Sequence, residues 1–228
     1  MASSRHVDAL VHRLETAIAQ EIHGRGRVAL AYSGGLASTL IAMIARKRCE
    51  LDCVVAGVDG SSDVLAARAA KSHLDYRIEA VILSREDAMR IRARIERSHP
   101  RLPRREVHNL IPLHAAIERA EGRSVLAGFG VPRPSAAMLA ALGRAAVVCP
   151  LRTIAPRMAA LSRPTLRAAA TALGLPREWA RVSHRAPADG AGIRDWLRGS
   201  NDDRHLSLRF SPVCENHEAR EFPSDDRP

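Results

Sequence analysis

Residues 27–39 hold the side chains best suited to chemistry. An apolar run at 28–32 predicts a short buried strand, Ser-Gly-Gly breaks it, and a helix is predicted from Leu36. Glycines let a backbone approach an anion closely, and a helix that begins there directs free N–H groups and its positive dipole end toward that anion. The added hydroxyl donors are Ser33, Ser38 and Thr39. The stretch predicts a phosphate-binding loop, with an ordinary strand-to-helix turn as the alternative.

Strands that alternate with helices must position this loop. The apolar pattern predicts strands at 28–32, 51–58, 77–83, 124–129 and 145–149. Helices are expected at 7–22, 36–48, after 63, and at 86–98, 110–120, 135–142 and 164–173. This alternation predicts an α/β fold: a three-layer α/β/α, Rossmann-like parallel sheet of about five strands. Ligands of such sheets bind at the carboxyl ends of the strands, where the turns 33–35, 60–62 and 128–130 would meet.

Length and composition indicate one main domain. The chain has 228 residues, 46% of them hydrophobic, which is enough for a single core. We expect an N-terminal helix within 1–24, the α/β domain at 25–198, and an irregular tail at 199–228. No signal peptide or long apolar span is evident, so a cytoplasmic protein without membrane contact is expected.

The chain is strongly basic, with a net charge of +10 that comes almost entirely from arginine. Such an excess of positive charge indicates an anionic partner such as a nucleotide or a nucleic acid. The alternative is a compositional bias toward arginine, because the arginines are spread along the whole chain. The densest run contains Arg90, Arg92, Arg94, Arg97, Arg101, Arg104 and Arg105. A nucleic-acid surface is one interpretation of this run. A solvated helix face, with Ile91 and Ile95 inward, is the favoured one.

The order of these motifs resembles the synthetase domain of glutamine-hydrolysing asparagine synthase. That domain is part of the adenine nucleotide α-hydrolase-like (PP-loop ATP pyrophosphatase) superfamily. The segments that carry the resemblance are 31–36, 57–63, 125–130, 167–176 and 181–193. The resemblance implies binding of ATP or AMP. The residues it implicates are Ser33, Gly34, Gly35, Ser38, Thr39, Val58, Ala127, Gly128 and Gly130.

The resemblance also implies a reaction: ATP adenylates a carboxylate, and ammonia then forms an amide. This sequence departs from the family pattern where acidic or lysine residues are usual. Ala37 replaces the loop aspartate, Pro132-Arg133 replaces Asp-Glu, and His184-Arg185 replaces a lysine. Because Mg²⁺ prefers carboxylate oxygens, these departures predict nucleotide binding with impaired or altered catalysis.

The remaining site candidates follow from the same departures. No metal is expected at Ala37, and Asp59 and Asp63 are weak substitutes for a Mg²⁺ ligand. The catalytic candidates are His184, Arg185 and Arg133.

Three alternatives stay open. The chain is an active amide-forming or adenylating enzyme with rearranged metal ligands, a non-catalytic partner subunit, or a tRNA-associated PP-loop protein. A partner protein or a homodimer is compatible with each of them. Any ammonia would come from solution or from a partner.

Overall fold

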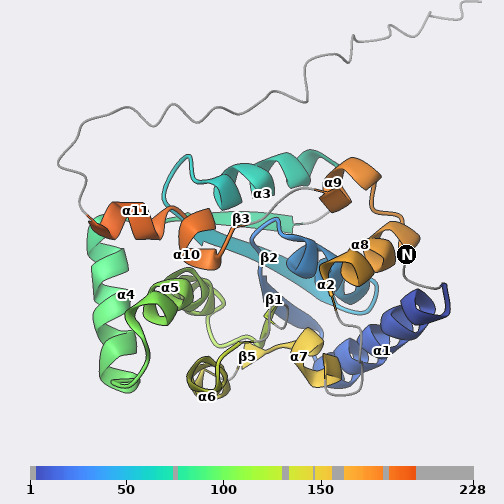
Figure 1. Ribbon diagram of the computed structural model, residues 1–228, viewed down its shortest axis with the longest axis horizontal. Coiled ribbons are helices and arrows are strands. Elements are labelled where there is room, and N and C mark those ends of the chain that lie inside the picture. The colour runs from blue at the N-terminus through green and yellow to red at the C-terminus, as the bar shows by residue number, and fades with distance from the viewer. Residues whose placement is uncertain are drawn as a thin grey trace, which may run out of the picture.

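A computed structural model of the chain describes residues 4–73, 77–129, 134–145, 147–155, 162–181 and 185–198. Five parallel strands form one sheet in the order β3-β2-β1-β4-β5 (Figure 1). The strands are β1 Arg27–Ala31, β2 Glu50–Gly57, β3 Arg77–Ile82, β4 Val125–Ala127 and β5 Val147–Val148. The predicted α/β fold with a parallel sheet of about five strands is confirmed.

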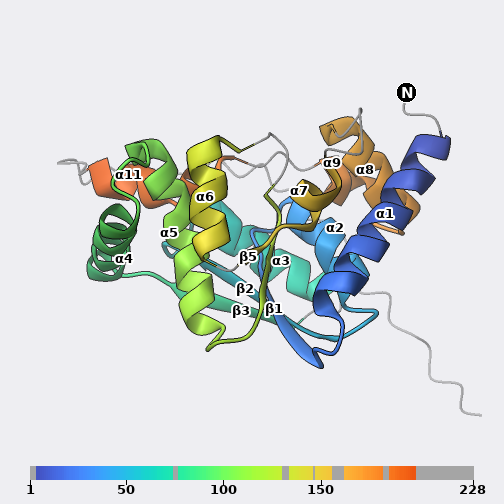
Figure 2. The ribbon, with the colours of Figure 1, turned by 90° about the horizontal axis from the view of Figure 1, so that it is seen from below.

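Helices cover both faces of this sheet (Figure 2). Their bounds are α1 Ser4–Ile22, α2 Leu36–Ala45, α3 Ser62–His73, α4 Arg85–Ser98, α5 Arg104–Arg119, α6 Ala136–Arg144, α7 Pro150–Ile154, α8 Arg163–Ala172, α9 Arg177–Arg181, α10 Pro187–Gly190 and α11 Ile193–Arg198. Among the described residues, none of these helices is long and apolar enough to span a membrane.

Each face of the sheet has its own core, because successive side chains of a strand point to opposite faces. Val28 and Leu30 of β1 belong to one core, which is closed by α1, α2, α3, α7 and α8. Ala29 belongs to the other, which is closed by α4, α5, α6 and α11. The buried run in β2 is nearly continuous, as is typical of a strand covered on both faces.

The structure corrects several predicted boundaries. Helix α5 begins at Arg104 rather than at Leu110 and contains Pro112 within it. Pro103 is the N-cap residue of α5 and not merely a helix breaker, because the first helical turn does not need its N–H. The short helices α10 and α11 were not predicted, and tertiary contacts rather than local propensity stabilise such short helices.

Candidate functional site

Three turns meet at the carboxyl edge of the sheet, as predicted. Strand β1 pairs with β2 on one side and with β4 on the other, so the turns that follow these strands are neighbours. Gly34 has a φ of +70°, and a Cβ there would lie 2.7 Å from Cβ of Ala66 in α3. A Cβ at Gly128 would lie 3.0 Å from the backbone nitrogen of Ser38. The turns are therefore packed so closely that two of these positions require glycine.

The N-terminus of α2 lies at this meeting point and has no side-chain cap. Its N-cap residue is Gly35, which makes no side-chain cap hydrogen bond to the first turn. By contrast, Ser84 caps α4 and Ser135 caps α6 through side-chain hydrogen bonds. Because the first N–H groups of a helix lack intrahelical partners, the start of α2 offers donors and a positive dipole end to an anion.

The predicted hydroxyl donors of this loop differ in their surroundings. Ser38 is buried and donates to the Gly35 carbonyl at 2.9 Å, and the Thr39 hydroxyl lies 3.1 Å from the Tyr32 hydroxyl. Ser33 is only partly buried, and its hydroxyl accepts from the Gly35 N–H at 3.3 Å. Ser38 and Thr39 therefore hold the loop in shape, while Ser33 faces the edge more openly.

The C-terminal segment that contains α10 covers the turn after β2. The Val58 N–H donates to the Ala191 carbonyl at 2.9 Å, and the Ser62 hydroxyl donates to the Gly190 carbonyl at 3.1 Å. A Cβ at Gly57 would lie 3.0 Å from the Ala191 oxygen. The backbone N–H of Val58 is thus already used within the protein, so Val58 can meet a ligand only through its carbonyl or its side chain.

The two acidic candidates for a metal ligand have different surroundings. Asp59 is exposed and pairs with Arg68 at 3.2 Å. Asp63 is only 6% exposed, and a Cβ at Gly190 would lie 2.3 Å from its Oδ1. Burial raises the pKa of Asp63 to about 7. The described residues contain no group of three or more His, Cys, Asp or Glu side chains that could hold a metal ion. As they stand, the Asp59 carboxylate is paired with Arg68 and that of Asp63 is buried, so neither is presented to Mg²⁺.

The other site residues that the sequence predicts differ in their burial, and some lie outside the described residues. Ala127 is buried at the end of β4, and Ala37 is half-buried in the first turn of α2. Arg185 is exposed. Gly130, Pro132, Arg133 and His184 lie outside the described residues, and so does the tail at 199–228.

Two cavities do not include the loop after β1. One, of about 500 Å³, is lined by His12, Glu15, Thr16, Ala19, Gln20, His23 and Arg48. Another, of about 290 Å³, is lined by residues of β3, α4 and α5, among them Ile82 and Arg90. Neither is lined by the loop after β1.

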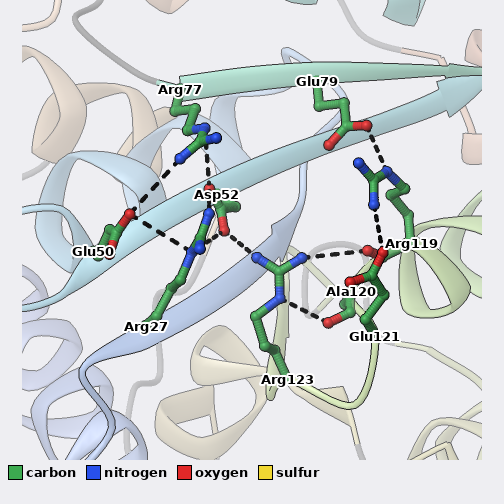
Figure 3. Close-up of polar contacts among 9 residues, drawn as sticks. All are labelled: Arg27, Glu50, Asp52, Arg77, Glu79, Arg119, Ala120, Glu121 and Arg123. Atoms are coloured by element: carbon green, nitrogen blue, oxygen red, sulfur yellow. Dashed lines mark hydrogen bonds and ion pairs between the residues drawn. The ribbon is translucent and has the colours of Figure 1, made fainter.

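The opposite, amino edge of the sheet carries an ion-pair network that the sequence did not reveal (Figure 3). Asp52 accepts from Arg27 at 2.7 Å, lies 3.6 Å from Arg77, and also contacts Arg123. The hydrogen bond from Arg27, together with the nearby arginine charges, lowers the pKa of Asp52. These residues lie at or just before the amino ends of four different strands. The order of the strands in the sheet places these ends side by side and so brings the four side chains together.

Comparison with known proteins places the chain in a family. A comparison with curated proteins gave no match. An NH3-dependent NAD synthetase from Campylobacter jejuni shares its fold at 12% identity over 78% of this chain and 79% of that chain, with a TM-score of 0.52. An NMN synthetase from Francisella tularensis shares it at 14% identity over 82% of this chain and 77% of that chain, with a TM-score of 0.51.

A third solved structure is less similar in shape. The predicted subunit of tRNA methyltransferase from Methanocaldococcus jannaschii is 16% identical over 70% of this chain and 94% of that chain, with a TM-score of only 0.37. The family model of asparagine synthase matches residues 9–130, more than half of the sequence. The chain therefore belongs to the asparagine synthase family, whose members are ATP-using PP-loop proteins.

Proposed function

We propose that the carboxyl edge binds ATP or AMP and that the phosphates lie against the N-terminus of α2. The observation that carries this proposal is the uncapped start of α2 at the meeting point of three turns. Free N–H groups at a helix N-terminus are a ready site for a phosphate, and family membership supports ATP as its source.

The residues of the carboxyl edge would have different roles in binding the nucleotide. Gly34 and Gly35 would bring the backbone close to the phosphates, and Ser33 would add a hydroxyl donor. Ala127 and Gly128 would form the wall beside the nucleotide, and at Gly128 a side chain would crowd the start of α2. Gly130, which lies outside the described residues, is included because of the resemblance of 125–130 to the family.

We infer that catalysis in this protein is impaired or altered. Cleavage of ATP between the α- and β-phosphates needs stabilisation of the charge on the departing pyrophosphate. Ala37 offers no carboxylate to a metal, Asp59 is paired with Arg68, and Asp63 is buried with a raised pKa. Positive charge from Arg133 or Arg185, with the imidazole of His184, is what the sequence offers instead.

Calorimetric titration with ATP and with AMP, each with and without Mg²⁺, tests the proposal, together with an assay for pyrophosphate release. We expect both nucleotides to bind, with affinities that Mg²⁺ leaves nearly unchanged, and no pyrophosphate above background. The variant Arg48→Gln changes a residue that lines the first cavity and not the carboxyl edge. As a control for the loss of one positive charge, it should bind both nucleotides with the affinity of the natural chain.

The other outcomes each overturn part of the proposal. ATP binding that tightens with Mg²⁺, together with pyrophosphate release, would show an active enzyme with rearranged metal ligands. Absence of binding by either nucleotide would remove the nucleotide site and leave the fold as a scaffold for a partner.

A further inference from the structure

The arginines of residues 90–105 fall into two sets in the structure. Arg90 and Arg94 contact Glu118 of α5, and Arg92 pairs with Glu96 at 2.8 Å. On the same helix, Ile91 and Ile95 are fully buried, as expected for a helix with one solvated face. This first set needs no external partner, because carboxylates of the chain already balance it.

The second set surrounds the turn between α4 and α5. Its exposed members Arg97, Arg101, Arg104 and Arg105 have no ion pair within the described part of the chain. The segment 97–105 contains no Asp or Glu. The two carboxylates that flank this segment in the sequence have other partners: Glu96 pairs with Arg92, and Glu106 accepts a hydrogen bond from Ser135 at 2.8 Å.

A fifth arginine joins this set from a distant segment. Arg144, at the end of α6, donates to the Ser98 carbonyl at the end of α4 at 3.2 Å. Burial and the charge of Arg144 lower the pKa of His99 in the same turn. We call the five residues Arg97, Arg101, Arg104, Arg105 and Arg144 the arginine corner.

Among the residues that the structure describes, no carboxylate pairs with the arginine corner. Leu102 is 9% exposed and packs into the second core, so the turn is anchored. Arg104 and Arg105 begin α5, which has no side-chain cap. Cations at a helix N-terminus oppose the helix dipole. An external anion would balance both the arginines and the free N–H groups of this turn.

The chemistry of the corner selects the kind of anion. Guanidinium groups match phosphate oxygens with two parallel hydrogen bonds. Five of them, spread over three helix ends and a turn, exceed what one phosphate can engage and suit a chain of phosphates. The large exposed apolar side chains of the described residues are Ile82 and Met89, which lie outside the corner. The corner therefore offers neither an anchor for a membrane nor a platform for stacked bases.

We propose that the arginine corner binds the phosphate backbone of a nucleic acid without reading its sequence. This proposal is independent of the nucleotide site. Contacts to phosphates release counterions, so the affinity should fall steeply with salt.

Fluorescence polarisation with a labelled single-stranded RNA of mixed sequence tests this. The triple variant Arg101→Gln, Arg104→Gln and Arg105→Gln removes three charges from the corner. The control variant Arg5→Gln, Lys47→Gln and Arg48→Gln removes three exposed charges elsewhere. We expect the corner variant to bind about tenfold or more weakly, and its salt slope to fall in magnitude by about 2, because each phosphate contact contributes about 0.7.

Several results would overturn the proposal. Equal losses in the two variants would assign binding to net charge alone. No binding of RNA by the natural chain would remove the site. Binding of anionic phospholipid vesicles but not of RNA would show that the corner recognises a membrane surface. A strong preference among RNAs of different sequence would contradict backbone recognition.

Discussion

The two edges of the sheet are built from opposite chemistry. At the amino edge, Asp52 gathers three arginines, and Arg119 pairs with both Glu79 and Glu121 (Figure 3). At the carboxyl edge, the loop of 33–37 has no charged side chain, yet the start of α2 lacks a side-chain cap. The charged groups of the amino edge have partners within the protein, whereas the first N–H groups of α2 at the carboxyl edge have no side-chain cap. Unsatisfied backbone groups therefore mark the candidate site better than charge does.

The largest effect is expected from Gly34→Ala. The new Cβ would lie 2.7 Å from Ala66 on a backbone with a φ of +70°, and such overpacking costs about 1–3 kcal/mol beyond the strain of the conformation. We expect loss of measurable nucleotide binding by calorimetry. Gly24→Ala shares the positive φ but meets nothing within 4 Å, so it should bind normally. Equal losses in both variants would show that backbone strain, and not the packed loop, explains the result.

Asp63→Asn should change how stability depends on pH. The pKa of Asp63 is raised to about 7, so the folded state holds this proton more tightly than the unfolded state. The resulting contribution to the free energy of unfolding is complete below the unfolded-state pKa and is lost as pH rises through about 7. The variant should be more stable than the natural chain near pH 8, on the order of 3 kcal/mol, and nearly equal to it near pH 4.

Urea unfolding of the natural chain and of this variant at both pH values measures the difference. The variant must be compared with the natural chain because buried histidines also change the stability with pH. Burial lowers the pKa of His108 and His114, so these two groups reduce the stability as pH falls, whereas Asp63 reduces it as pH rises. A variant that is less stable than the natural chain at pH 8 would mean that ionised Asp63 has a partner.

Asp52→Asn tests the amino edge. Removing the carboxylate leaves Arg27, Arg77 and Arg123 without their shared partner, and we expect a loss of about 1–2 kcal/mol near neutral pH. Because the pKa of Asp52 is lowered, its contribution is present above its unfolded-state pKa and is lost as pH falls below about 4. The two proteins should therefore become equal in acid.

The control for Asp52→Asn is ATP affinity, which should stay unchanged because the network lies at the far edge from the loop. A variant with weakened ATP binding and unchanged stability would contradict the division of roles between the two edges.

The carboxyl edge was predictable because its signals are local. An apolar run, Ser-Gly-Gly and helical spacing are contiguous in the sequence, so the strand β1 and its turn follow from propensity and pattern alone. The parallel sheet then fixes which turns meet, since alternating strands and helices place the carboxyl ends of the strands together.

The rest depends on contacts between distant segments. The hydrogen bond from Val58 to Ala191 explains why a C-terminal segment covers the second turn, and no local pattern indicates it. The network around Asp52 requires the strand order, which sequence spacing does not give. Likewise Arg144 joins the arginine corner only because α6 packs near the end of α4.

The smallest effect is expected from Asp59→Asn, which tests whether a carboxylate at the carboxyl edge binds Mg²⁺. The pair with Arg68 is exposed on both sides, so its loss should change stability by less than about 0.5 kcal/mol. ATP affinity should be the same with and without Mg²⁺, as in the natural chain, and Asp195→Asn on the exposed side of α11 should behave alike. Should Asp59→Asn alone remove a dependence on Mg²⁺, then Asp59 leaves Arg68 to hold the metal. The carboxyl edge would then depend on charge, and its contrast with the amino edge would fail.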